Sequence, residues 1–257
     1  PSLAYRSQRR RVLMNLYLFH DMSKLHRRRC FFEDFFGSFI FLRKLYISDF
    51  SIKYLNFDKK HILESNCGYG VILDLFMNKC KTTSGVDHLV YKNSLIERGH
   101  QYFSNINNII LTKKTFDIVL CLSELEHKKN PIVFLKKLKK ILKKNGKLII
   151  RVPNFNNIYR YVIGYDFLKF DYRTSHNFYF SEKNLDILFR KINFKILNKM
   201  GYNEYSINHL FHYFRSKKRA TEIKSKKLFK NLENKRFIKN IEEQKVSTSL
   251  IYILKNG

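Results

Sequence analysis

Residues 61–70, with the sequence HILESNCGYG, have the side chains and spacing best suited to binding a small ligand. A short apolar run ends in the acid Glu64 and opens into a small-residue turn, and an amphipathic stretch follows. This order predicts a strand over 61–65, a tight turn, and a helix over 69–78 whose N-terminal amides face a ligand. A dinucleotide site would need glycine or alanine where Leu73 stands. The segment therefore favours a ligand without a pyrophosphate.

A second acid ends the next apolar run, Ser84-Gly85-Val86-Asp87, which predicts a strand over 83–87. Asp87 would stand at the end of that strand, where its carboxylate can accept hydrogen bonds from the hydroxyls of a ribose. Its alternative role is that of a helix N-cap ahead of Leu89. The turn and this acid together suit a nucleoside ligand, for which S-adenosylmethionine is the leading candidate.

An apolar run over 116–122 predicts another strand, and the triplet Leu125-Glu126-His127 follows it. Asn130, with proline after it, can cap a helix expected over 131–144, and an Asn-Gly pair leads into a strand expected over 147–152. These features and the two acids, in this order, resemble the class I S-adenosylmethionine-dependent methyltransferases. The resemblance is greatest to the group that contains the ubiquinone-biosynthesis O-methyltransferases and many methyltransferases of glycan-biosynthesis clusters. It covers residues 50–199 and extends in part to 248–255.

The resemblance implies an α/β fold with a doubly wound, mostly parallel seven-stranded sheet and an antiparallel last strand. The alternation of predicted strands and helices independently favours a parallel sheet with helices on both faces. The last strand is expected to pair antiparallel beside a strand at 193–199. Four parts are expected along the chain: an N-terminal helical cap over 1–49, the cofactor-binding core over 50–203, a basic helical insertion or lid over 204–245, and the last core strand over 246–257.

The resemblance also implies which residues bind the cofactor. These are Glu64, Asn66, Cys67, Gly68 and Gly70 in the turn, Asp87 at the ribose, Asn105 and Ile106 at the adenine, and Cys121, Leu122 and Ser123 along the pocket. Asn66 stands where the family most often has glycine, but asparagine tolerates the left-handed backbone of such a turn. Asn105 stands where the family often has an acid, and its amide can still bond the adenine edge.

Methyl transfer from a sulfonium is an in-line displacement, so the protein must align donor and acceptor, exclude water and in some cases remove a proton. His127 is the candidate general base, because histidine exchanges protons readily near neutral pH. Its alternative is a role in the architecture of the pocket. His176 and Tyr179 are candidate substrate contacts, and a structural bond to a backbone carbonyl is the alternative for His176. No metal site is predicted.

The composition is strongly basic, with 50 Lys and Arg against 21 Asp and Glu and a formal net charge of +29. This charge suits nucleic acid, an anionic small molecule or a membrane surface. It also fits an A+T-rich genome, because Lys, Asn, Ile, Phe and Tyr abound while proline occurs only 3 times. The six lysines between 136 and 144 are expected on the solvated face of their helix.

The distribution of apolar residues and cysteines bears on localisation. No apolar stretch reaches the ~20 residues that cross a bilayer, and no signal-peptide pattern is found. The four cysteines form no CxxC pair. These observations predict a cytoplasmic protein with reduced thiols, rather than a disulfide framework or a zinc site.

Several functions are compatible with this sequence. The leading hypothesis is methylation of oxygen, or less often nitrogen, on a small molecule or glycan precursor, with 204–245 closing over an anionic substrate. The positive charge favours an RNA methyltransferase, but the strand end at 121–124 lacks the Asn/Asp-Pro-Pro-aromatic signature. A non-catalytic binding protein that kept the fold would account for Asn66 and Asn105. An oxidoreductase is the weakest hypothesis, because of Leu73.

Overall fold

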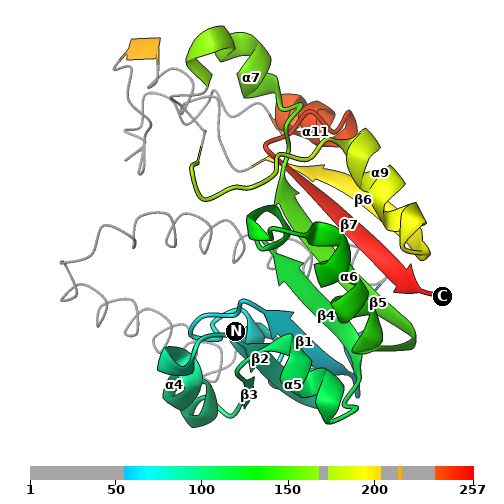
Figure 1. Ribbon diagram of the computed structural model, residues 1–257. Helices are drawn as coiled ribbons and strands as arrows, with labels where there is room; N and C mark the ends of the chain where they lie inside the picture. The colour runs from blue at the N-terminus through cyan, green and yellow to red at the C-terminus, as the bar shows by residue number, and fades with distance from the viewer. Residues whose placement is uncertain (1–54, 168–172, 204–213, 216–234) are drawn as a thin grey trace. The chain divides into compact units, whose positions relative to one another are not determined.

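The computed structural model describes residues 55–167, 173–203, 214–215 and 235–257 (Figure 1). The expected cap over 1–49 and most of the expected insertion over 204–245 lie outside these residues. In the described part of the chain, no helix has the length and apolar character needed to span a membrane.

Seven strands form one sheet, in the order β3-β2-β1-β4-β5-β7-β6. Their bounds are β1 His61–Ser65, β2 Thr82–Val86, β3 Gln101–Phe103, β4 Phe116–Leu122, β5 Leu142–Pro153, β6 Phe194–Tyr202 and β7 Ser249–Asn256. Neighbouring strands from β3 to β5 pair in parallel, whereas β7 pairs antiparallel with both β5 and β6. The predicted fold class is confirmed, including the antiparallel last strand.

The direction of chain progression reverses beside β1. From β1 the chain moves outward to β2 and β3, and it then returns to place β4 on the other side of β1. In open α/β sheets, ligands bind beyond the carboxyl ends of the strands at such a reversal. Ser65, Val86 and Leu122 are the last residues of β1, β2 and β4. The segments that follow these three residues are therefore expected to form the site.

Helices and short 3-10 turns connect the strands (Figure 1). Their bounds are η2 Leu73–Leu75, η3 Leu89–Tyr91, α4 Lys92–Glu97, α5 Ile106–Leu111, η4 Leu125–His127, α6 Pro131–Lys140, α7 Ile158–Ile163, η5 Gly164–Asp166, α9 Glu182–Lys191 and α11 Lys235–Glu243. Apolar residues of α5, α6 and α9 pack on one face of the sheet with Val119 and Cys121 of β4. Ile118 and Leu120 belong to the core on the opposite face. Because β4 is buried on both faces, its sequence from Ile118 to Leu122 is continuously apolar.

The prediction of a helix over 69–78 is wrong, because this segment contains only the 3-10 turn η2 with turns on both sides. The backbone bonds mix two spacings: Asp74 N donates to Gly70 O at 3.1 Å, whereas Leu75 N donates to Ile72 O at 3.1 Å. Ile72 precedes η2, and its apolar side chain offers no acceptor to the free amides. The amphipathic pattern is present, but the segment lacks the cap that would start a regular helix.

The start of α6 is as predicted and its end is not. Asn130 caps it by accepting a hydrogen bond from Val133 N at 3.1 Å. The helix ends at Lys140 instead of continuing to residue 144. Leu142 already pairs with Phe116 of β4, and the register then shifts before the regular pairing continues. Competition from strand pairing therefore shortens the helix, and the strand expected over 147–152 is the inner part of β5.

Candidate functional site

The turn after β1 has an unusual backbone. Asn66, Gly68 and Gly70 all have positive φ angles, of 59°, 53° and 75°. The amides of Asn66 and Cys67 both donate to Val86 O, at 2.8 and 3.3 Å, which ties the turn to the end of β2. The left-handed conformation expected at Asn66 is confirmed. Asparagine serves here because it is one of the few side chains that adopt this conformation at low cost.

This conformation predicts opposite outcomes for two substitutions of Asn66. Asn66→Gly is expected to fold with a thermal midpoint close to that of the native protein, because glycine adopts positive φ freely. Asn66→Ala is expected to lower the free energy of unfolding by about 1–2 kcal/mol. Alanine is strained at positive φ and has no side-chain amide to form a compensating local hydrogen bond. Thermal denaturation of the two variants checks this. A collapse of Asn66→Gly would show instead that the amide of Asn66 makes a required bond.

The turn also packs closely against its surroundings. A Cβ on Gly70 would lie 2.5 Å from Leu95 Cδ2 and 2.9 Å from His100 Cδ2. His100 is fixed in that place by Thr83 Oγ1 at 2.7 Å and by Asp74 Oδ1 at 3.0 Å. A Cβ on Gly85 would collide with the Sγ of Cys67. The side chain of Cys67 therefore packs under the turn and only its backbone can face a ligand.

Asp87 connects the turn to the end of β2. Its Oδ2 accepts a hydrogen bond from Gly68 N at 2.6 Å, and its Oδ1 accepts one from His88 N at 2.7 Å. The side chain of Asp87 does not cap η3, whose N-cap residue is His88. Each carboxylate oxygen keeps a second lone pair for a ligand. Asp87 thus both shapes the turn and offers acceptors beside it.

Glu64 is a buried carboxyl at the base of the site. It is 3% exposed, and its Oε2 has no hydrogen-bond partner among the described residues. Burial raises the pKa of Glu64 well above its ordinary value, and the nearby charges of Asp87, Glu124 and Asp74 raise it further. The folded protein therefore favours the protonated form of Glu64.

This raised pKa predicts how stability changes with pH. The folded protein holds the proton of Glu64 more tightly than the unfolded chain does, so stability falls as pH rises above the ordinary carboxyl range toward the raised pKa. Glu64→Gln, which resembles the protonated form, is expected to make this decline shallower. Urea unfolding of both proteins at pH 5 and pH 8 measures the difference. Exposed Glu97→Gln is the matched control, and parallel pH curves for the native protein and Glu64→Gln would contradict the prediction.

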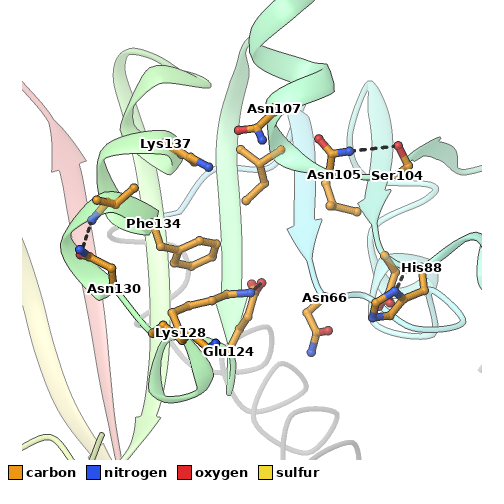
Figure 2. Close-up of a pocket in the computed structure, with 15 residues that line it drawn as sticks. Asn66, His88, Ser104, Asn105, Asn107, Glu124, Lys128, Asn130, Phe134 and Lys137 are labelled. Carbon is orange, nitrogen blue, oxygen red and sulfur yellow. Dashed lines mark hydrogen bonds and ion pairs between the residues drawn. The ribbon is translucent and has the colours of Figure 1, made fainter. Parts of the chain in front are cut away.

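A pocket of about 400 Å³ opens at the carboxyl ends of β1, β2 and β4. It is lined by Asn66, Val86, Asp87, His88, Ser104, Asn105, Ile106, Asn107, Glu124, Lys128, Lys129, Asn130, Val133, Phe134 and Lys137. Figure 2 shows side chains approaching from two sides, with Asn66, His88 and Asn105 on one side and Phe134 and Lys137 on the other. A volume of this size is typical of a small-molecule site.

Four of the predicted cofactor residues line this pocket: Asn66, Asp87, Asn105 and Ile106. Asn105 also caps α5 by accepting from Asn108 N at 3.0 Å. The other turn residues, Glu64, Cys67, Gly68 and Gly70, build its base and are not among the lining residues. The predicted residues Cys121, Leu122 and Ser123 are also absent from the pocket lining.

Those three residues are buried where β4 ends. Ser123 has a φ of 53°, and its hydroxyl accepts a hydrogen bond from an Arg151 guanidinium nitrogen at 3.0 Å. Ser123 N donates to Arg151 O at 2.9 Å. These bonds fasten the strand end to β5 and direct the chain into η4. Ser123 therefore holds the end of β4 against β5 and does not line the pocket. Glu124, the next residue, does line it.

Sequence reasoning missed several pocket residues. Glu124 forms an ion pair with Lys128 at 2.6 Å, and both line the pocket. Glu124 stands directly after the end of the predicted strand, and this position could have indicated that it lines the pocket. Lys137 also lines the pocket, so the expectation that all six helix lysines are solvated is wrong for this one. In the facing segment, Asn105 and Ile106 were predicted from the resemblance, whereas Ser104 and Asn107 were not.

The three residues predicted for catalysis and substrate lie together but do not line this pocket. The rings of His127 and His176 are 4.8 Å apart between centroids, and those of His176 and Tyr179 are 5.3 Å apart. His127 Nδ1 lies 2.9 Å from Ser175 O. Because a carbonyl oxygen only accepts hydrogen bonds, Nδ1 carries the proton and Nε2 of the neutral ring keeps a lone pair. The Tyr179 hydroxyl accepts from Arg173 N at 2.7 Å.

The strand order, the antiparallel β7 and a pocket at the reversal beside β1 define a class I methyltransferase fold. The chain belongs to the methyltransferase domain family, whose family model matches residues 41–199. It thus carries a methyltransferase domain with the fold of the class I methyltransferases. The resemblance seen in the sequence is confirmed at the level of this class.

Individual relatives are more distant. An uncharacterized protein of Methanocaldococcus jannaschii is 32% identical over 133 residues, which are 49% of this chain and 57% of that protein. The match therefore spans little more than half of the relative's length.

Several solved structures share the fold. A SAM-dependent methyltransferase from Archaeoglobus fulgidus has a TM-score of 0.53 and 18% identity, covering 85% of this chain and 94% of its own. A possible histamine N-methyltransferase from Thermotoga maritima has a TM-score of 0.55 and 17% identity, covering 86% and 91%. The magnesium protoporphyrin IX methyltransferase of Synechocystis PCC 6803, solved with bound SAH, has a TM-score of 0.54 and 10% identity, covering 88% and 86%.

Proposed function

We propose that this chain transfers a methyl group from S-adenosylmethionine to an oxygen atom of a small-molecule or glycan-precursor acceptor. The adenosine would occupy the pocket between Asp87 and Ile106, with Asp87 accepting from the ribose hydroxyls and Asn105 bonding the adenine edge. The single observation that carries the cofactor part is the position of Asp87. Its carboxylate is buried, lines the pocket and is fixed by two backbone amides.

The charge at the base of the site supports a cationic ligand. The charges of Asp87 and Glu124 raise the pKa of Glu64, so these carboxyl groups are close enough to influence one another. Glu64 and Asp87 form no ion pair among the described residues, although the whole chain carries a net charge of +29. A sulfonium would be stabilised by the carboxylate of Asp87, whereas the diphosphate of a dinucleotide would be repelled by it. This favours S-adenosylmethionine over NAD.

The acceptor side is proposed at His127, His176 and Tyr179. An oxygen acceptor must lose a proton when it takes a methyl group, and His127 Nε2 is an available basic atom. The cysteines are poor candidates for this role, because burial raises the pKa of both Cys67 and Cys121.

Two measurements test the proposal. Calorimetry is expected to show binding of S-adenosylmethionine and S-adenosylhomocysteine and much weaker binding of NAD. Incubation with isotope-labelled S-adenosylmethionine and a small-molecule extract, followed by mass spectrometry, is expected to give a labelled methyl ether. A separate incubation with RNA tests the alternative acceptor. Label in RNA and none in the extract would overturn the proposed acceptor class, and absence of cofactor binding would overturn the whole proposal.

A further inference from the structure

We infer that Glu126, His127 and His176 form a binding site for one divalent transition-metal ion. Among the described residues they are the only such group of three, with one ligand atom from each side chain within 4.8 Å of the others. Two imidazoles and a carboxylate form a nitrogen and oxygen donor set that suits zinc, iron, manganese or cobalt. Three ligand atoms about 2.1 Å from one ion lie on average no more than about 3.6 Å apart. A contraction of at most about 1.2 Å would therefore complete the site.

The orientation of His127 supports this role. Its Nδ1 donates to Ser175 O at 2.9 Å, which leaves Nε2 as the nitrogen that can bind a metal ion. Metal-binding histidines in proteins usually donate their other ring N–H to a carbonyl or carboxylate in this way. The bond fixes both the tautomer and the ring orientation. His127 is therefore set up for binding through Nε2.

The backbone holds the other two ligands in place. The amides of Asn177 and Phe178 donate to Glu126 O at 2.9 and 3.2 Å. The side-chain amide of Asn177 donates to His127 O at 2.7 Å. These three bonds fasten the segment that carries His176 onto η4, although the two segments are far apart in the sequence. The three ligands thus come from two backbone segments that are bonded directly to each other.

The three side chains differ in burial. Glu126 is 1% exposed and His176 is 9% exposed. His127 is only half-buried, so the cluster is open to solvent on its side. An ion held there would keep free coordination positions for water or for a substrate oxygen.

This inference rests on the proposed function only for the role of the ion. η4 lies between Glu124 and Lys128, which both line the cofactor pocket, so the ion would stand beside that pocket. An acceptor hydroxyl bound to the ion loses its proton to solvent more readily. Its oxygen then attacks the methyl carbon, the carbon–sulfur bond breaks, and the electron pair stays on sulfur to give S-adenosylhomocysteine. In this arrangement His127 acts as a ligand.

The test is a titration of the full chain with Co²⁺, followed by visible absorption, with calorimetric binding of S-adenosylmethionine measured in parallel. One equivalent of Co²⁺ is expected to produce bands typical of nitrogen and oxygen ligands, without sulfur charge-transfer bands. Glu126→Gln and His176→Gln are each expected to weaken Co²⁺ binding at least about tenfold. His61→Gln, at the amino end of β1, is the control and is expected to leave it unchanged.

The outcomes separate the two proposals. Unchanged Co²⁺ affinity in the variants, sulfur charge transfer, or no binding by the native chain would overturn the metal site, whatever the cofactor does. Loss of cofactor binding with Co²⁺ binding intact would overturn the proposed function and leave the metal site in place. Glu126→Gln is nearly isosteric, so it provides the comparison if His176→Gln fails to fold.

Discussion

Replacing Asp87 with alanine is expected to weaken the binding of S-adenosylmethionine by roughly 1.5–3 kcal/mol, or about 10- to 150-fold, through the loss of two charge-assisted hydrogen bonds to the ribose. The structure adds a second contribution. Asp87 also accepts from Gly68 N and His88 N, so the variant leaves these two amides without their partner and loosens the turn. The upper end of the range is therefore expected. Calorimetry with S-adenosylhomocysteine, which is neutral at sulfur, gives the measurement free of the sulfonium charge.

Two further variants separate the contributions. Asp87→Asn keeps one acceptor oxygen and the side-chain shape but removes the charge. Its affinity for S-adenosylhomocysteine is therefore expected to lie between those of the native protein and Asp87→Ala. Asp58→Ala, at an exposed turn before β1, is the control and should bind like the native protein. Equal affinity of native protein and Asp87→Ala, with the folded state intact, would rule out Asp87 as the ribose-binding acid.

The features predicted correctly from the sequence share one property, which is that they depend on local chemistry. The positive φ of Asn66, the cap at Asn130 and the apolar run of β4 each follow from a few neighbouring residues. The seven-stranded sheet with its antiparallel last strand could be predicted because the resemblance supplied this fold. The place of Asp87 followed from its position directly after an apolar strand.

The features that were missed depend on partners that are distant in the sequence. The helix expected over 69–78 had the right amphipathic pattern, but no residue caps it. Lys137 was assigned to a solvated face, because periodicity does not reveal that α5 lies opposite and encloses a pocket. The cluster of His127 with His176 needs the bonds that fasten the segment after Arg173 onto η4. Spacing along the chain carries no signal of such contacts.

Replacing His127 with alanine is expected to lower turnover by roughly 10²–10⁴ while the affinity for S-adenosylmethionine barely changes. The reason is that Nε2 of His127 is the basic atom available at the proposed acceptor side, whereas His127 does not line the cofactor pocket. Single-turnover rates and calorimetry on the same samples measure the two quantities. Joint loss of cofactor binding and turnover would assign His127 to the architecture of the pocket.

The choice of replacement makes this test sharper. In His127→Asn the side-chain amide nitrogen can take the place of Nδ1 and keep the bond to Ser175 O, but no atom replaces Nε2. This variant is expected to be as slow as His127→Ala and more stable, because the segment with His176 stays fastened. Turnover close to the native value in His127→Asn would show that the bond to Ser175, and not Nε2, is what the reaction needs. A chelator then decides how Nε2 acts: it should slow the native protein if Nε2 holds a metal ion and leave it unchanged if Nε2 takes the proton directly.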